Sequence, residues 1–282
     1  MAGGLSRRAV LAALPLTTLA GASRAAAPGL SLTGKFVQGG YAVGRTTPRA
    51  SIDVDGLVQS TASANGWFVI GFDRDAPPTS KLTVTTPDGS SVDERTIAVG
   101  DFDIQRIDGL PPEQVTPTDP ALLERITAEN VRKVAGFASQ ADIEGFRDGF
   151  ILPVVGARRS ARFGGQRILN GEPKRPHYGV DLATPVGTPV RAPAAGLVCF
   201  AETGLHYEGG LVLVDHGQGL VTAYLHLSKI LVPTGTYVTQ GQPIAQTGKE
   251  GRATGPHLCW RMKWRGRNLD PSLLVGAGPF RT

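Results

Sequence analysis

The segment His257–Trp264, HLCWRMKW, constrains the fold more strongly than any other stretch of this chain. Leucine, tryptophan, methionine and tryptophan occupy every second position, and polar residues or a cysteine occupy the positions between them. This alternation is typical of a half-buried β-strand, with one face in the core and the other toward solvent or a site. A sheet must therefore surround this segment.

The first half of the chain shows short strand-like runs separated by turn residues, from about Leu30 to Asp108. They include ASIDVDG, GWFVIGF and KLTVTTPDGSSVDERTIAV, the last with Pro-Asp-Gly as its turn. The pattern predicts an immunoglobulin-like β-sandwich over residues 28–108. This region holds no cluster of histidines, cysteines or paired acids, which indicates a spacer or adaptor.

A proline-rich stretch, GLPPEQVTPTDP, follows and predicts a linker over residues 109–149. Asp119 and Pro120 supply an N-cap and a first-turn proline, so a helix is expected to begin there. Its apolar positions keep roughly helical spacing and predict a packing stripe: Leu122, Leu123, Ile126, Val131 and Val134. Short β-branched runs then return, and predict a second, mainly β domain over residues 150–282.

The first 27 residues belong to neither domain. The sequence Ser6-Arg7-Arg8 precedes an apolar run from Ala9 to about Leu19, and small residues follow from Ala22 to Ala27. This layout predicts a signal peptide, with an arginine pair that indicates the twin-arginine route and cleavage near Ala25 to Ala27. The run is shorter than the ~20 apolar residues of a membrane span. We expect an exported protein of the periplasm or cell envelope, with no stable membrane span once the signal is removed.

Charge is divided unequally along the chain. Residues 28–150 carry 11 Lys/Arg and 17 Asp/Glu, whereas residues 151–282 carry 15 and 7. The formal net charge of +5 becomes +2 without the three arginines of residues 1–27, and does not indicate a nucleic-acid partner. The basic half is expected to face a polyanion, such as cell wall, or the acidic half of its own chain.

Three of the five histidines and one of the two cysteines lie in three short strings. The strings are HYGVD (His177, Asp181), AYLHLS (His226) and GPHLCW (His257, Cys259). Zinc takes nitrogen, sulfur and oxygen ligands of this kind, three from the protein when a water keeps the fourth position. The strings are therefore candidates for one metal site.

Spacing along the strands separates the roles of these residues. On one strand face His257 and Cys259 stand roughly 7 Å apart, so that one can ligate an ion while the other reaches its water. His177 and Asp181 would lie ~13 Å apart on a straight strand and can share an ion only if the chain bends. Gly179 permits such a bend.

Four longer strings resemble, in order and spacing, the lysostaphin-like (LytM-type) zinc metalloendopeptidases that cut peptidoglycan cross-bridges. They are RFGGQRILNGEPKRPHYGVDLATPVGTPVRAPAAGLV, VLVDHGQGLVTAYLHLSKI, VTQGQPIAQTGKEGRATGPHLCW and NLDPSLL. The resemblance covers about residues 150–275. It implies a compact antiparallel β domain with a narrow groove that holds one zinc per chain.

The resemblance also implies roles for single residues. His177 and Asp181 match the metal ligands of the family's His-x-x-x-Asp motif, and His226 and His257 match its catalytic histidines. The third family ligand is the second histidine of a His-x-His motif, and here this sequence departs, because Cys259 occupies that position. No His-Glu-x-x-His string is present, so the two histidines must carry the proton transfers.

The implied function is hydrolysis of peptide cross-links in peptidoglycan, with its stem peptides as substrate. One alternative is a non-catalytic LytM-type domain that binds the wall and regulates amidases. Another is a disulfide between Cys259 and Cys199, which an oxidising periplasm would allow. Cys199 lies in the apolar run GLVCFAE, where a small buried hydrophobe is the ordinary role of cysteine.

The remaining polar residues near these strings have plainer interpretations. His216, in DHGQG, is expected to stabilise a turn, and His206, in GLHYEGG, to lie in a solvated loop. Arg261 and Lys263 share the polar face of the His257 strand. They either meet a substrate carboxylate or serve as ordinary surface charges.

Overall fold

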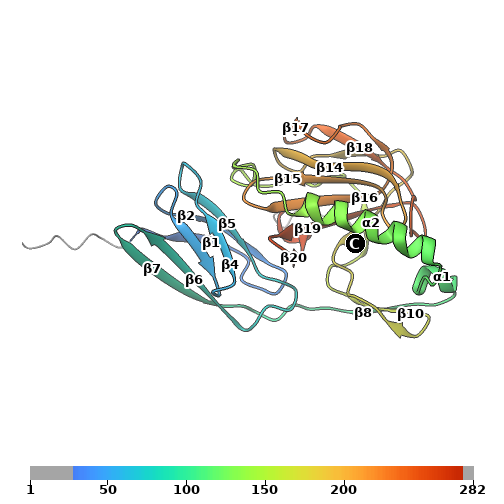
Figure 1. The fold of residues 1–282 in the computed structure, drawn as a ribbon, viewed down its shortest axis with the longest axis horizontal. Helices are drawn as coiled ribbons and strands as arrows, with labels where there is room; N and C mark the ends of the chain where they lie inside the picture. Colours follow the sequence, from blue (N-terminus) through green and yellow to red (C-terminus); the bar gives the residue numbers. More distant parts are fainter. Residues whose placement is uncertain (1–27, 276–282) are drawn as a thin grey trace, which may run out of the picture.

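The computed structural model describes residues 28–275, which form two β-rich parts joined by a segment that contains a long helix (Figure 1). The prediction of a mainly β protein is confirmed. The signal peptide predicted for residues 1–27 lies outside the described residues. Among residues 28–275 we find no helix of the length and apolar character needed to cross a bilayer.

The N-terminal part is a sandwich of two antiparallel sheets. One sheet has the strand order β1-β2-β5 and the other β4-β3-β6-β7. The strands are β1 (Ser31–Gly34), β2 (Tyr41–Arg45), β3 (Ser51–Val54), β4 (Val58–Thr61), β5 (Trp67–Gly71), β6 (Thr79–Thr86) and β7 (Gly89–Thr96). Ile52, Phe68 and Val84 are fully buried and belong to one apolar cluster. Seven short strands in two facing sheets form the predicted immunoglobulin-like architecture.

The C-terminal part is a ten-stranded sheet in which every pair is antiparallel. Its main path runs β17-β14-β15-β16-β19-β12-β9. The strands are β9 (Arg158–Ala161), β12 (Val180–Ala183), β13 (Pro189–Arg191), β14 (Gly196–Leu205), β15 (Gly209–Asp215), β16 (Leu220–Ile230), β17 (Tyr237–Val238), β18 (Pro243–Thr247), β19 (His257–Trp264) and β20 (Arg267–Leu269), followed by the 3-10 helix η1 (Pro271–Leu273). All four apolar side chains of β19 are fully buried, as the alternation in its sequence predicts.

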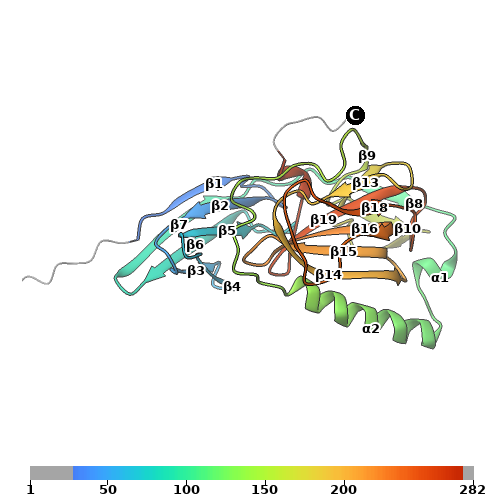
Figure 2. The ribbon, with the colours of Figure 1, turned by 90° about the horizontal axis from the view of Figure 1, so that it is seen from above.

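Two helices lie between these parts, α1 (Pro112–Val115) and α2 (Pro120–Phe137). The longer helix begins where the sequence predicts, because the Asp119 carboxylate accepts a hydrogen bond from the Ala121 N–H. Figures 1 and 2 show α2 lying along one side of the C-terminal sheet, over β14, β15 and β16. The apolar cluster beneath it includes Phe200, Leu213 and Leu225.

The buried face of α2 differs from the predicted packing stripe. Leu123, Val131 and Val134 are exposed, so this part of the prediction is wrong. Ile126 is buried as predicted, but the rest of the buried face consists of Glu129, Lys133 and Gly136. The cause is local: Gly136 allows close approach, since a Cβ there would lie 2.9 Å from Leu213 Cδ1, and the two charged residues are buried because both are paired.

A small fourth sheet joins distant parts of the chain. Strand β8 (Ile104–Ile107) pairs in parallel with β10 (Gln166–Leu169), and β10 pairs with β11 (Glu172–Pro173). Strand β8 lies inside the range predicted for the sandwich, yet it hydrogen-bonds to the C-terminal half. Figure 1 shows β8 and β10 together, away from the two sandwich sheets.

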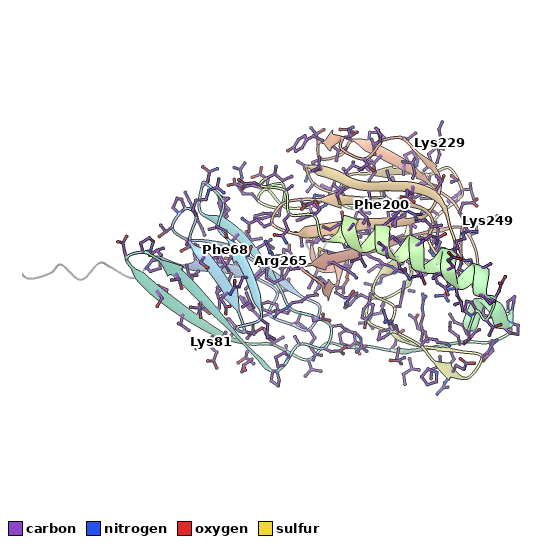
Figure 3. All side chains as sticks on the ribbon, in the orientation of Figure 1. Phe68, Lys81, Phe200, Lys229, Lys249 and Arg265 are labelled. Atoms are coloured by element: carbon purple, nitrogen blue, oxygen red, sulfur yellow. The ribbon has the colours of Figure 1, made fainter. Side chains whose placement is uncertain are left out.

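The sandwich docks on the C-terminal part through polar contacts that include side-chain hydrogen bonds to strand backbone. The Gln218 side chain donates to Trp67 O at 2.8 Å and accepts from Val69 N at 3.3 Å, so that it pairs with β5. Arg265 donates to Gln59 O at 2.8 Å, and Figure 3 shows it at the junction. These contacts tie β5 and the end of β4 to the strands that build the site.

Candidate metal centre and active site

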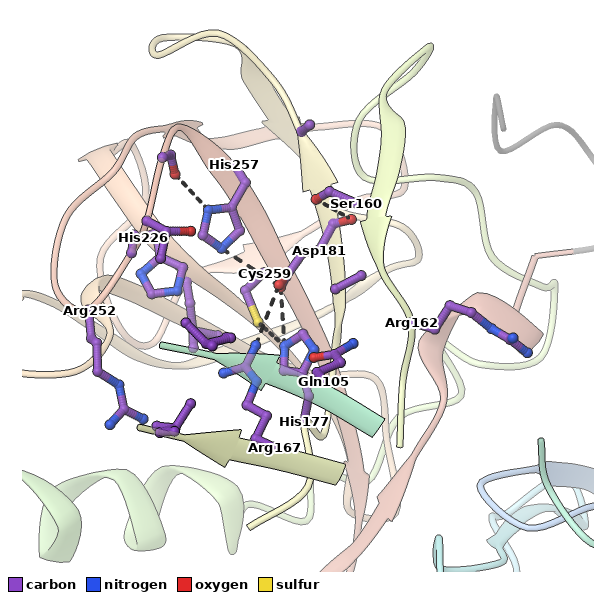
Figure 4. Close-up of a pocket in the computed structure, with 18 of the residues that line it drawn as sticks. Gln105, Ser160, Arg162, Arg167, His177, Asp181, His226, Arg252, His257 and Cys259 are labelled. Carbon is purple, nitrogen blue, oxygen red and sulfur yellow. Dashed lines mark hydrogen bonds and ion pairs between the residues drawn. The ribbon is translucent and has the colours of Figure 1, made fainter. Parts of the chain in front are cut away.

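A groove of about 900 Å³ opens between the β8-β10 segment and the C-terminal sheet (Figure 4). All five site residues proposed from the sequence line it: His177, Asp181, His226, His257 and Cys259. They come from a loop and three adjacent strands, β12, β19 and β16. The fold thus brings together the three strings that spacing alone could not join.

Strand register explains why Asp181 and Cys259 meet. They are direct partners in the antiparallel pair β12–β19, so their side chains share one face. On the other side of β19, Leu225 of β16 pairs with Cys259, which places His226 next to the same position. His177 enters from the loop before β12, where its backbone N–H and C=O bond to Gly165 and Gly164, both at 2.8 Å.

Three atoms suited to metal ligation converge in the groove. One nitrogen of His177, one carboxylate oxygen of Asp181 and the sulfur of Cys259 lie within 4.8 Å of one another. His177 Nε2 is 3.1 Å from Asp181 Oδ1 and 3.4 Å from Cys259 Sγ. Bonds of about 2.0–2.3 Å at tetrahedral angles would separate such ligands by about 3.5 Å. Asp181 Oδ1 is also buried without a hydrogen-bond donor, which suits a cation. The donor set fits one zinc-sized ion.

Gly179 lies at a bend immediately before β12, as the sequence predicts, and close contacts give a second reason for a glycine there. A Cβ there would lie 2.7 Å from Arg261 Cγ and 3.1 Å from Cys259 Sγ. Its small size is therefore required where the chain passes over β19. The bend that joins His177 to Asp181 lies in the loop that precedes β12.

His226 and His257 stand side by side next to the three converging atoms, with ring centroids 4.6 Å apart. Nδ1 of His226 donates to Glu250 O at 2.7 Å, and Nδ1 of His257 donates to Gly255 O at 2.8 Å. These carbonyls fix the tautomer and leave each Nε2 as an acceptor. His257 Nε2 lies 3.7 Å from Asp181 Oδ1, so it faces the candidate metal position.

Burial dominates the protonation of this site. Burial, together with the charge of His257, lowers the pKa of His226 to about 4, and burial also lowers the pKa of His177. Burial raises the pKa of the Cys259 thiol to about 12, against the effect of the Arg261 guanidinium. Burial would raise the pKa of Asp181 too, but the neighbouring His177, His257 and Arg167 outweigh this, and the pKa lies below the ordinary value. His177 and His226 are therefore neutral near pH 7.

The two cysteines do not pair. Both are free in the structure. Cys199 lies on β14 and Cys259 on β19, which are three strands apart in the sheet and hence separated by about 14 Å. A disulfide needs Cα atoms within about 7 Å. The disulfide alternative is therefore wrong for this fold.

Of the two basic residues on the His257 strand, Arg261 lines the groove and Lys263 packs on the side of α2. Arg261 donates from Nε to Cys259 Sγ at 3.4 Å, so its charge lies beside the sulfur. Lys263 Nζ lies 4.7 Å from the centre of the Phe137 ring, on the side of α2, and does not line the groove. Only the first of these two residues is placed to act at the site.

Sequence reasoning missed several residues that line the groove. Arg167 of β10 brings Nη2 to 3.6 Å from Asp181 Oδ2, and Arg252 lies over the Tyr207 ring at 4.5 Å. Residues 103–107 form one wall. Arg167 lies within a string that carries the family resemblance, but no spacing marks it. The wall residues carry no sequence signal, because their partner strand is distant in the chain.

The two remaining histidines lie outside the converging cluster. His216 is fully buried; its Nδ1 donates to Ala195 O at 2.8 Å, and its Nε2 accepts from the Thr222 hydroxyl at 2.7 Å. His206 packs edge-on against Tyr207, with ring centroids 4.6 Å apart. Neither lines the groove. Their contacts are structural.

Comparisons with known proteins agree with this arrangement. Residues 175–271 match peptidase family M23. The peptidoglycan DD-endopeptidase ShyA of Vibrio cholerae is 46% identical over 96 residues, which are 34% of this chain and 22% of ShyA. The DD-carboxypeptidase/endopeptidase Mpg of Neisseria gonorrhoeae is 38% identical over 121 residues, 43% of this chain and 28% of Mpg. The matched segments thus span less than a third of these relatives.

A solved structure extends the likeness beyond the matched segment. A crystal structure from Pseudomonas aeruginosa, assigned to the M23 peptidases, has a TM-score of 0.67 and 28% identity. The alignment covers 86% of this chain and 96% of that one, so it includes the sandwich as well as the C-terminal part. The match of residues 175–271 to peptidase family M23 is therefore accompanied by a likeness in fold over most of the chain.

Proposed function

We propose that this protein is an exported zinc metalloendopeptidase that hydrolyses peptide cross-links of bacterial peptidoglycan in the periplasm or cell envelope. One observation carries the proposal: three ligand-type atoms converge beside two histidines whose Nδ1 atoms are tied to carbonyls. The match of residues 175–271 to peptidase family M23 supports the reaction class, and the relatives named as peptidoglycan endopeptidases support the stem peptides as substrate.

His177, Asp181 and Cys259 would hold the zinc, each through one atom. Bound zinc supplies a Lewis acid that polarises the scissile carbonyl and acidifies a water. The thiol must lose its proton to ligate, and Arg261 beside Sγ favours the thiolate. The buried carboxylate oxygen of Asp181 gains in this way the partner that it lacks within the protein.

His226 and His257 would move the protons. Near pH 7 a neutral His226 is in the form that a general base requires. Its Nε2 can accept the proton of an attacking water and return it to the leaving amine, while the Glu250 carbonyl keeps the ring oriented. His257, beside it, would stabilise the oxyanion after protonation. No carboxylate base is needed in this arrangement.

Variants of two histidines test the division of roles. His177→Ala should lose both zinc and turnover, because it removes one of three protein ligands. His226→Ala should retain zinc and lose turnover by about 10²–10⁴-fold, the usual contribution of a general base. Zinc per chain and muropeptides released from purified peptidoglycan, identified by mass, are measured in parallel. A zinc-free His226→Ala protein would overturn the assignment.

The same assay separates the enzyme from a regulator. A domain that binds the wall and activates amidases would release no muropeptide by itself but would increase release by an added amidase. The complete set of ligand and histidine side chains favours hydrolysis by this chain itself. Zinc-loaded wild type that releases nothing while activating an amidase would replace the proposal with the regulatory one.

A further inference from the structure

Helix α2 is tied to one loop of the groove at three successive points. The loop, defined here as residues 204–208, comprises the end of β14 and the turn that leads to β15, and Tyr207 and Glu208 line the groove. One face of α2 presents three charged side chains to it, at intervals of four residues: Arg125, Glu129 and Lys133. The helix lies outside residues 175–271, the segment matched by the family model.

Each of the three side chains holds a different loop residue. Arg125 donates to Gly204 O, and Glu129 accepts from His206 N at 2.9 Å. Lys133 Nζ reaches both carboxylate oxygens of Glu208 at 2.8 Å. The Lys133 and Glu208 side chains are only 9% and 14% exposed, so this pair is largely removed from water.

The loop in turn holds the backbone of His226. Glu208 O accepts from His226 N at 2.8 Å, while Glu250 O accepts from the His226 ring. His226 has φ +65°, a left-handed conformation that a side-chain-bearing residue adopts at a cost in free energy. Such a conformation persists only when its surroundings hold it in place. Glu208 is one of the residues that do so.

We propose that the Lys133–Glu208 ion pair positions His226 for proton transfer, through the Glu208 backbone carbonyl. Lys133 and Glu208 are thus positioning residues, and α2 is part of the active-site architecture. The inference rests on the proposed function, because it assigns to His226 a role in turnover. Its structural content, that Lys133 maintains the His226 backbone bond, stands independently of any activity.

Removal of Lys133 should affect the loop in a defined way. Glu208 would become a largely buried carboxylate without its cation, which is strongly unfavourable. Because Glu208 lines the groove, its side chain would turn toward the water there and shift the carbonyl that holds His226. A displacement of about 1 Å at a reacting group can cost on the order of 100-fold in rate.

The test compares Lys133→Met with Arg132→Met in the full chain. Arg132 is the preceding residue of α2 and forms an ion pair with Glu202 of β14, but its side chain and that of Glu202 are 47% and 35% exposed. The control therefore removes a neighbouring ion pair that does not reach residues 204–208. Lys133→Arg restores the charge, and Glu208→Gln keeps the shape of the pair should Lys133→Met fail to fold.

Two readouts are measured with zinc-loaded protein: kcat and KM on peptidoglycan fragments, and site-resolved hydrogen exchange of the His226 amide. We expect Lys133→Met to lower kcat about 10- to 100-fold with KM nearly unchanged, and to accelerate His226 amide exchange at least about 10-fold. Glu208→Gln should show smaller shifts of both readouts in the same direction. Lys133→Arg should recover most of both readouts, and Arg132→Met should match wild type.

Each result bears on one claim. Unchanged kcat and unchanged His226 exchange in Lys133→Met, or in Glu208→Gln where the methionine variant does not fold, overturn the inference. Equal losses in Arg132→Met also overturn it, since they would indicate general destabilisation of α2. A wild type that cleaves nothing refutes the proposed function alone, because faster exchange in Lys133→Met would still show that the ion pair holds His226.

Discussion

Cys259 changes the charge of the proposed centre relative to a site with histidine in that position. A thiolate and a carboxylate together would cancel the charge of a bound divalent ion. A water on that ion would therefore be less acidic than a water on an ion with only one anionic ligand. The structure adds Arg261, whose Nε lies 3.4 Å from the sulfur. The positive charge of the guanidinium offsets part of the negative charge of the thiolate. This role gives a reason for an arginine on this face of β19.

The thiol ligand predicts a zinc content that depends on one cysteine. Cys259→Ala should bind well below one zinc per chain, while the apolar face of β19 stays intact. Cys199→Ala is the matched control and should retain a full equivalent, because Cys199 lies three strands away. Cys259→His should keep zinc and raise activity near neutral pH, provided that the imidazole fits beside Gly179. Metal analysis of the three purified variants decides, and a full equivalent in Cys259→Ala would contradict the assignment.

His216 predicts how stability depends on pH. Burial lowers its pKa from 6.5 to about 4, although the Ala195 carbonyl opposes this. The unfolded chain therefore takes up this proton first as the pH falls, so the contribution of His216 is complete above pH 6.5 and is lost toward pH 4. The loss is on the order of 3 kcal/mol. Urea unfolding of wild type and His216→Asn should show a shallower pH dependence for the variant, and equal slopes would refute the prediction.

Among the helices and strands, the sequence predicts those that a local pattern marks, but not the pairing of segments that are distant in the chain. The β19 strand and the start of α2 follow from alternation and from the Asp119-Pro120 cap, and the five site residues follow from their motifs. The convergence of His177, Asp181 and Cys259 needed the β12–β19 register, which no single segment contains. Strand β8 was assigned to the sandwich, because its pairing with β10 is parallel and distant in the chain.

The face of α2 shows a second limit of pattern reasoning. Apolar spacing favoured Leu123, Val131 and Val134 as the packing side, whereas the helix buries Glu129 and Lys133. Charged side chains are buried when the fold supplies partners for them. Here the partners are His206 N for Glu129 and Glu208 for Lys133, and both lie on a loop far along the chain. No property of the helix sequence alone carries that information.

The start of α2 gives a prediction at this scale. Asp119→Ala removes the acceptor of the Ala121 N–H and should lower the free energy of unfolding by about 1 kcal/mol. Asp119→Asn serves as the control, since asparagine caps about as well and should cost little. Denaturant titration of both variants provides the comparison. Equal stability of the alanine variant and wild type would show that the cap contributes nothing to this helix.

Over the whole molecule, the sandwich and the C-terminal sheet share one core. The same apolar cluster includes Phe68 of β5 and Trp264 of β19, and Gly71 leaves room for Leu269, whose Cδ1 would lie 2.7 Å from an added Cβ. Gln218 and Arg265 complete the junction with hydrogen bonds to strand backbone. We therefore expect the two parts to unfold together.

Gln218 allows this coupling to be tested. Gln218→Ala leaves the buried Val69 N–H without its acceptor, at about 1–3 kcal/mol, and removes one of the two donors to Trp67 O, which keeps the hydrogen bond from Ser63 N. Calorimetry should resolve two transitions where wild type has one. Gln38→Ala, which removes hydrogen bonds within the sandwich, should lower stability and keep a single transition. Persistence of one transition in Gln218→Ala would mean that the apolar contacts alone couple the parts.

The parallel strand β8 has a consequence for the order of folding. Its four residues gain their ladder only after β10 is in place, because Ile104 must find Gln166 across the linker, and such non-local pairings form late. A short edge strand with an exposed Ile104 also opens at low free-energy cost. The wall of the groove that β8 forms is therefore the last to form during folding and the first to open in the native state. In native-state exchange the β8 amides should report sub-global openings that widen the groove for bulky cross-linked substrates while β16 and β19 remain protected.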